Sequence, residues 1–209
     1  MKLTHLIRGL EGVFLENQNN AEIKGLTEDS RLVRKGFLFF ARKGYRTSGQ
    51  NFIEEAVRKG AAAICLQNSE PAPVLSIPVI RAKSISDAEI LMSNRFYDHP
   101  SKKMKVIGVT GTNGKTTITY LLEAIALKAK LNPGVIGTIN YRYRLKSSSR
   151  LISIPAPNTT PNILQIQELL FQMYKNGCKV VFMEVSSHSL AQNRVGGIDF
   201  RGAIFTNLT

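Results

Sequence analysis

The chain has 209 residues, which is enough for one large or two small domains, and its 43% hydrophobic content can supply ordinary buried cores. No run of about 18 uncharged apolar residues occurs. Residues 1–12 carry His, Arg and Glu where a signal peptide needs an apolar core. These features exclude a disordered chain and membrane insertion, and we expect a cytoplasmic monomer.

The net charge of +13 suits an anionic partner, because clustered Lys and Arg raise the local concentration of phosphate-bearing ligands. The positive residues are scattered along the chain, without the interleaved aromatic side chains on which single-stranded nucleic acids stack. We therefore expect no nucleic-acid partner.

Only two cysteines occur, Cys65 and Cys178, and each lies in or beside an apolar stretch. Thiols stay reduced in the cytoplasm. We therefore expect both to be packing residues, and not a disulfide or a metal-binding pair.

Short apolar runs and helical periodicity alternate in the first hundred residues, which predicts a small α/β unit. Ser86 and Glu89 have capping-box spacing and predict the start of a helix that ends near Tyr97. Residues 98–101 then indicate a domain boundary. The other elements expected here are a strand at 37–41, a helix at 52–59 closed by Gly60, and a strand at 61–66.

A second α/β series follows, with strands that are near-continuous apolar runs, as expected when helices cover both faces of a parallel sheet. The basic, serine-rich segment 142–150 predicts a surface hairpin or loop. The expected strands are 104–110, 134–139, 179–185 and 202–208; the expected helices are 116–130, with Ile118, Leu121, Leu122 and Ile125 on one face, and one from Thr160-Pro161 to Gly177.

The turn between strand 104–110 and helix 116–130 has the context of a phosphate-binding loop. Its glycines let backbone N–H groups point inward, and the helix N-terminus adds positive potential. Lys115 is placed to reach the β- and γ-phosphates, and the Thr116 hydroxyl to ligate Mg²⁺. The usual first glycine is replaced by Val109, with Gly108 beside it. The alternative is a glycine-rich turn with a solvated lysine.

Two further segments place polar side chains near the expected sheet edge. Glu184 ends an apolar strand and is followed by Ser186, Ser187 and His188, at the edge where parallel α/β sheets bind ligands. It is a candidate second Mg²⁺ contact, although such a carboxylate is often only solvated. The turn 158–160 either supplies Thr160 as a helix N-cap or holds an anionic or sugar ligand.

Three ordered motifs carry a resemblance to a known family. Gly111-Thr112-Asn113-Gly114-Lys115-Thr116-Thr117, Asn158-Thr159-Thr160-Pro161 and Glu184-Val185-Ser186-Ser187-His188 are similar in order and spacing to Mur ligases of the MurE type. Asp29-Ser30-Arg31 looks like that family's UDP-binding domain. The resemblance covers essentially the whole chain. It implies an α/β fold, with a UDP-sugar-binding domain over 1–100 and a truncated P-loop, Rossmann-like, mostly parallel-sheet ATP-binding domain over 101–209.

The resemblance also implies residue roles, with ATP and Mg²⁺ as cofactors. Contacts to the uridine diphosphate are implied for Glu28, Ser30, Tyr45, Arg46 and Thr47, and contacts to the muramoyl-peptide for Asn158, Thr159, Thr160, Ser186, Gln192 and Arg194. The ATP phosphates would be held by Gly111, Thr112, Asn113, Gly114, Lys115, Thr116 and Thr117, and Mg²⁺ by Thr116 and Glu184. The implied catalytic residues are Lys115, Glu184 and His188.

The implied activity is an ATP-dependent ligase that adds the third amino acid, meso-diaminopimelate or L-lysine, to UDP-N-acetylmuramoyl-L-alanyl-D-glutamate. The family's later Arg-Asp-His-Leu segment, modified lysine and amino-acid-binding domain are not in these 209 residues. We therefore expect a fragment that binds nucleotide and UDP-sugar without completing turnover. Two alternatives stay open, namely another P-loop phosphotransferase such as a small kinase, and a non-catalytic binding module.

Overall fold

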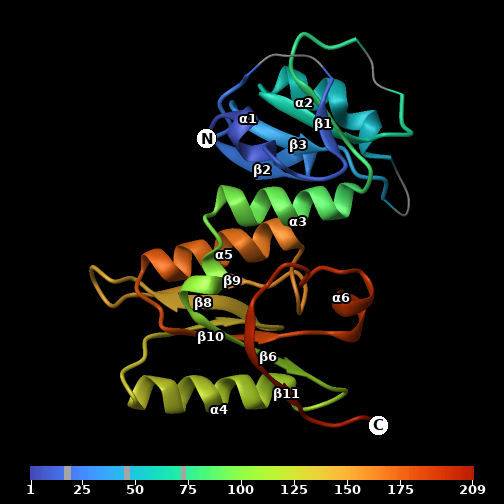
Figure 1. Cartoon of the computed structure of the whole chain (residues 1–209). Coiled ribbons are helices and arrows are strands. Elements are labelled where there is room, and N and C mark those ends of the chain that lie inside the picture. Colours follow the sequence, from blue (N-terminus) through green and yellow to red (C-terminus); the bar gives the residue numbers. More distant parts are fainter. Residues whose placement is uncertain (17–19, 45–47, 72–73) are drawn as a thin grey trace. The chain divides into compact units, whose positions relative to one another are not determined.

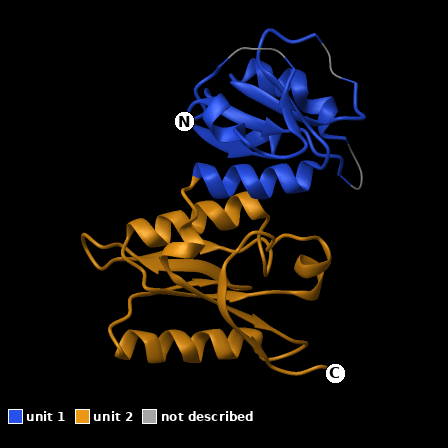
Figure 2. Cartoon of the chain, in the orientation of Figure 1, with its two compact units in different colours: residues 1–96 blue, residues 97–209 orange. Residues whose placement is uncertain are grey.

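The computed structural model describes residues 1–16, 20–44, 48–71 and 74–209. The chain divides into two compact units, Met1–Phe96 and Tyr97–Thr209 (Figure 2). Within the described ranges, no helix combines the length and the apolar character needed to cross a membrane.

The first unit is a five-stranded sheet in the order β1-β5-β4-β3-β2 (Figure 1). Strands β2 to β5 run parallel, and β1 pairs antiparallel with β5. The strands are β1 Val13–Leu15, β2 Gly25–Thr27, β3 Phe37–Phe40, β4 Ala63–Gln67 and β5 Val79–Ala82. The helices are α1 Leu3–Ile7, α2 Ile53–Arg58 and α3 Ile85–Phe96, with the 3₁₀ turns η1 Ser30–Leu32 and η2 Gly49–Phe52.

The predicted strand–helix–strand unit is confirmed as β3, α2 and β4. Its apolar residues form one core, in which Phe39, Ile53 and Ile64 are almost fully buried. The predicted capping box is wrong. Ser84 caps α3, because its Oγ accepts from the Asp87 N–H at 3.2 Å. Helix α3 therefore begins at Ile85, before Ser86.

The second unit is a six-stranded sheet in the order β11-β6-β10-β7-β8-β9. Strands β11, β6, β10 and β7 are parallel, and β8 and β9 are antiparallel. In Figure 1, α4 and α5 lie on opposite faces of this sheet. The strands are β6 Lys105–Thr110, β7 Pro133–Ile136, β8 Asn140–Arg144, β9 Leu151–Pro155, β10 Val180–Glu184 and β11 Phe200–Phe205. The helices are η3 Pro100–Lys103, α4 Lys115–Lys128, α5 Ile163–Lys175 and α6 Ser187–Ala191.

These two mostly parallel sheets confirm the predicted α/β fold class. The central strand β10 is buried along its whole length, as its apolar run predicted. The same expectation is wrong for β11. This strand lies at the sheet edge, and its residues alternate between half-buried and exposed. Its regular pairing also ends at Phe205 rather than Leu208, because the following residues leave the strand to contact the turn after β6.

Two further expectations for the second unit need correction, and a third is confirmed. The predicted apolar face of α4 is wrong at Leu121 and Ile125, which are 55% and 66% exposed, whereas Leu122 packs against the core as expected. The residues of α4 that are buried are Thr119 and Ala126. Strand β7 ends at Ile136, three residues before the predicted end, because the chain turns there. The predicted hairpin at 142–150 is confirmed as the end of β8 and the turn to β9.

The two cysteines are free and buried, as predicted. Burial raises the pKa of both thiols, and that of Cys178 to about 12. Neither thiol is therefore a nucleophile at neutral pH.

Candidate nucleotide and substrate site

The turn between β6 and α4 has the backbone geometry of a phosphate-binding loop. Gly111 and Gly114 have φ values of +127° and +82°, a region that favours glycine. A Cβ on Gly111 would lie 2.8 Å from the Asn207 carbonyl oxygen, so only glycine fits. A Cβ on Gly114 would meet nothing within 4 Å. Helix α4 begins directly afterwards at Lys115, and its N-terminus supplies free N–H groups and positive potential.

The loop is braced by the residues that follow β11. The Thr112 N–H donates to the Asn207 carbonyl at 2.9 Å, and the Asn113 N–H donates to Asn207 Oδ1 at 3.0 Å. The Thr206 hydroxyl donates to the Asn113 carbonyl at 2.6 Å. The sequence did not single out Thr206 or Asn207 as loop contacts. Their position just past an apolar strand was the available signal, because parallel strands end at one edge.

The Lys115 side chain folds over its own loop. Its ammonium donates to the Gly111 carbonyl at 2.6 Å and to the Thr112 carbonyl at 3.0 Å. These two carbonyls hold the ammonium charge against the glycine-lined turn. A triphosphate bound there would compete for the same ammonium protons.

Glu184, the last residue of β10, is only 1% exposed and accepts hydrogen bonds on both carboxylate oxygens. Its Oε2 accepts from the hydroxyls of Thr116 and Thr138, each at 2.9 Å. Its Oε1 accepts from the Thr138 N–H at 3.2 Å. The alternative that Glu184 is simply solvated is therefore wrong. Sequence reasoning missed Thr138, because nothing in the chain order shows that β7 lies next to β10.

Gly137 makes room for this carboxylate. A Cβ at Gly137 would overlap Glu184 Oε1 and would lie 3.1 Å from Glu184 Cδ. Thr116 and Glu184 thus place a hydroxyl and a carboxylate side by side at the start of α4. Oxygen ligands of this kind are the ones that Mg²⁺ prefers, so the donor set fits the predicted metal.

The predicted sugar-peptide motif packs against the end of β10. The Thr160 hydroxyl donates to the Glu184 carbonyl at 2.9 Å and accepts from the Ser186 N–H at 3.2 Å. Thr160 is therefore not a helix N-cap, and Asn162 caps α5 by accepting from the Gln165 N–H at 2.8 Å. The Thr160 side chain instead fixes the turn onto the strand.

The four other predicted substrate residues lie nearby. Arg194 donates to the Thr160 carbonyl at 3.1 Å and to Gln192 Oε1 at 2.8 Å. The Thr159 hydroxyl lies 3.2 Å from the Thr138 hydroxyl. The Asn158 side chain is exposed, while its carbonyl accepts from Tyr141 at 2.8 Å. The three motifs quoted from the sequence therefore meet at one edge of the sheet.

His188 is not part of this hydrogen-bonded cluster. It lies on the short helix α6 with an exposed side chain. Across residues 97–209, no hydrogen bond joins its imidazole to the turn after β6 or to Glu184. Its catalytic role stays a prediction.

The predicted uridine diphosphate residues all belong to the first unit. Tyr45, Arg46 and Thr47 lie outside the described residues. The Ser30 hydroxyl is buried and donates to Glu55 Oε2 at 3.1 Å. Glu28 pairs with Arg42 at 3.8 Å. Ser30 and Glu28 therefore have different partners.

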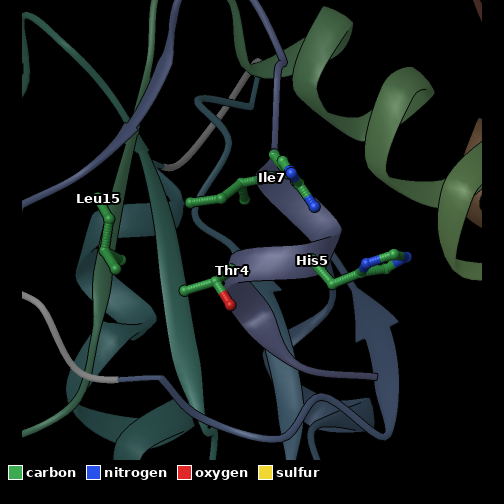
Figure 3. A pocket seen from close by; sticks show the side chains of 5 residues that line it. Thr4, His5, Ile7 and Leu15 are labelled. Atoms are coloured by element: carbon green, nitrogen blue, oxygen red, sulfur yellow. The ribbon is translucent and has the colours of Figure 1, made fainter.

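A depression of about 540 Å³ opens elsewhere on the first unit (Figure 3). Figure 3 shows Thr4 and Ile7 directed toward Leu15, while His5 points away. Of the predicted uridine diphosphate residues that the structure describes, neither Glu28 nor Ser30 lines it. The lining residues are Thr4, His5, Ile7, Arg8 and Leu15.

The family models for the Mur ligase middle domain and for the Mur ligase family, catalytic domain, match residues 109–209 and 22–97 respectively. The chain belongs to the Mur ligase family. It is 44% identical over 209 residues to the UDP-N-acetylmuramoyl-L-alanyl-D-glutamate--2,6-diaminopimelate ligase of Geobacillus kaustophilus. It is 43% identical over 212 residues to the ligase of that name from Geobacter sulfurreducens. These alignments cover 100% of the chain and 41% and 40% of the two relatives, so the chain spans about two fifths of their length.

Solved structures of Mur ligases have the same fold. A UDP-N-acetylmuramoyl-L-alanyl-D-glutamate--2,6-diaminopimelate ligase has a TM-score of 0.69 at 28% identity, over 90% of this chain and 37% of that one. The MurF ligase of Thermotoga maritima, solved in complex with ADP, has a TM-score of 0.53 at 25% identity, over 78% of this chain and 32% of that one. The resemblance to MurE-type Mur ligases is thereby confirmed.

Proposed function

We propose that residues 111–117 bind ATP and that Thr116 and Glu184 hold its Mg²⁺. We further propose that the chain binds UDP-N-acetylmuramoyl-L-alanyl-D-glutamate, and that it forms part of a cytoplasmic ligase adding the third amino acid. The names of the relatives favour 2,6-diaminopimelate as that amino acid. The observation that carries the proposal is the Thr116–Glu184 hydrogen bond at 2.9 Å, which joins the glycine-lined turn to the strand end that Thr160 also contacts.

In the proposed reaction the D-glutamate carboxylate attacks the γ-phosphorus of ATP, and ADP leaves. The amine of the amino acid then attacks the acyl phosphate, inorganic phosphate leaves, and the amine loses a proton as the amide forms. Such transfers need positioning and charge neutralisation more than covalent help from the protein. Mg²⁺, when bound, would neutralise charge on the phosphate oxygens.

The chain's own groups supply the positioning. Lys115 must leave the Gly111 and Thr112 carbonyls to reach the phosphates, and its ammonium then faces the developing negative charge. The N–H groups at the start of α4 point at the same phosphates. The turn at 158–160, held on Glu184 by Thr160, presents polar groups to the sugar-peptide.

Calorimetric titration of the 209-residue chain with β,γ-methylene-ATP and Mg²⁺ tests the nucleotide half of the proposal. We expect binding in the wild type and a loss of at least about tenfold in Lys115→Ala, equivalent to about 1.4 kcal/mol. Lys128→Ala, at the exposed far end of the same helix, is the matched control and should bind like the wild type. Equal affinities for all three chains would contradict the proposal. Phosphoryl transfer to a hydroxyl acceptor, without UDP-sugar binding, would favour a kinase instead.

A further inference from the structure

The exposed residue Thr138, in the turn after β7, lies between the nucleotide and sugar-peptide ends of the site. Its oxygen lies 2.9 Å from Glu184 Oε2 on one side and 3.2 Å from the Thr159 hydroxyl on the other. Glu184 also accepts from Thr116, the residue of the glycine-lined turn that we assign to the metal. Thr138 therefore lies between a predicted metal ligand and a predicted substrate residue.

The direction of these hydrogen bonds follows from counting protons. An ionised carboxylate only accepts, so the Thr138 hydroxyl must donate its single proton to Glu184. Toward Thr159 it is then an acceptor, and the Thr159 hydroxyl must be the donor. The Thr159 hydroxyl thus donates its proton to Thr138. A free lone pair on the Thr159 oxygen can then accept from an N–H or O–H group of the ligand, which favours such a group over an anionic oxygen.

We propose that Thr138 is a positioning residue that couples the two ligand sites, with its hydroxyl transmitting the placement of the Glu184 carboxylate to Thr159. The inference rests on the function proposed above. A metal and nucleotide that fix Glu184 also fix Thr138, and so orient Thr159 before the sugar-peptide arrives. The entropy lost in ordering these side chains is then paid when the metal and nucleotide bind. The sugar-peptide, which binds second, does so more tightly.

Two other threonines near Glu184 cannot carry this coupling. The Thr119 hydroxyl lies 3.5 Å from Glu184 Oε1, but its proton has a better acceptor in the Thr116 carbonyl at 2.8 Å. Thr160 contacts the Glu184 backbone carbonyl, which does not turn with the carboxylate. The side-chain hydroxyl of Thr138 is the link that responds to the carboxylate.

The test is a calorimetric titration of UDP-N-acetylmuramoyl-L-alanyl-D-glutamate into the 209-residue chain, with and without saturating Mg²⁺ and β,γ-methylene-ATP. The ratio of the two dissociation constants measures the coupling. For the wild type we expect binding at least about fivefold tighter with nucleotide. Thr138→Val removes the hydroxyl while its backbone N–H still reaches Glu184, and its ratio should fall to about one.

Thr138→Ser restores the hydroxyl and should restore the wild-type ratio, which a purely structural role would not require. Thr119→Val is the matched control and should keep the wild-type ratio. A Thr138→Val ratio equal to that of the wild type, or a wild-type ratio of one, overturns the coupling while leaving the proposed function intact. Failure of the folded wild type to bind either ligand overturns the proposed function itself.

Discussion

Glu89 on α3 should make the stability of the first unit depend on pH. Its side chain is only 1% exposed, and Oε2 accepts from Arg42 at 3.2 Å. Its Oε1 has no hydrogen-bond partner among the described residues. Burial, followed by the charge of Glu28, raises the pKa of Glu89 to about 8, against the opposing effect of Arg42. Cys65 also faces this carboxylate, and burial raises its pKa too.

The sign of the effect follows from proton linkage. Between the ordinary carboxyl pKa of 4.5 and the folded value of about 8, the folded state binds more protons than the unfolded state. The stabilising contribution of protonated Glu89 is therefore complete below pH 4.5 and is lost as the pH rises through 8. At 1.36 kcal/mol per pH unit the whole interval corresponds to about 5 kcal/mol at most. Between about pH 6 and pH 8.5 we expect a loss of about 2.5 kcal/mol.

Urea unfolding of the wild type and of Glu89→Gln at these two pH values measures the loss. Glutamine keeps the size and the acceptor for Arg42 but does not titrate. The drop in the free energy of unfolding between the two pH values should therefore be smaller by about 2.5 kcal/mol in this variant. Glu54→Gln, on the exposed side of α2, is the matched control and should keep the wild-type slope. If Glu89→Gln kept the wild-type slope, or were less stable than the wild type at the higher pH, the reasoning on Glu89 would be refuted.

Three other substitutions test the second unit. Gly137→Ala places a Cβ against Glu184 and should weaken Mg²⁺-nucleotide binding at least about tenfold by calorimetry. Asn162→Ala removes the cap of α5 and should lower the free energy of unfolding by about 1 kcal/mol in urea. Arg142→Leu leaves the half-buried Glu123 carboxylate without its bidentate partner and should cost about 2 to 3 kcal/mol in the same assay.

Each of these has its own control. Gly202→Ala meets only an ordinary contact of 3.5 Å with Ile107 and should leave nucleotide binding unchanged, whereas equal losses in both glycine variants would mean that the effect is not local to Glu184. Asn162→Ser should recover most of the cap energy. Removing Glu123 together with Arg142 should recover part of the loss, and full additivity of the two losses would refute their pairing.

The periodicity of the sequence predicted the fold class because both sheets are built from short apolar strands that alternate with helices. The turn at 111–117 was identifiable because its chemistry is local, with glycines, a lysine and a helix start in one segment. Core strands such as β10 were equally clear, since a strand buried on both faces is apolar throughout.

The order of the strands across the sheet could not be predicted from the sequence. Thr138 and Thr206 reach the site because β7 and β11 end at the same edge as β6 and β10, although they are far apart in the chain. The burial of Arg142 could not be predicted either, because both of its partners lie on α4. Glu123 accepts from its guanidinium, and the Tyr120 ring centroid lies 4.1 Å from the guanidinium carbon. Local rules also left Thr160 open as a helix cap, whereas its hydroxyl makes a tertiary contact with Glu184.

Electron paramagnetic resonance with Mn²⁺ in place of Mg²⁺ measures whether Thr116 and Glu184 jointly hold the metal of a nucleotide on the turn at 111–117. In the presence of β,γ-methylene-ATP the wild type should bind Mn²⁺, and Thr116→Val and Glu184→Gln should each weaken that binding at least about tenfold. Unchanged Mn²⁺ binding in both variants would show that these two residues do not hold the metal.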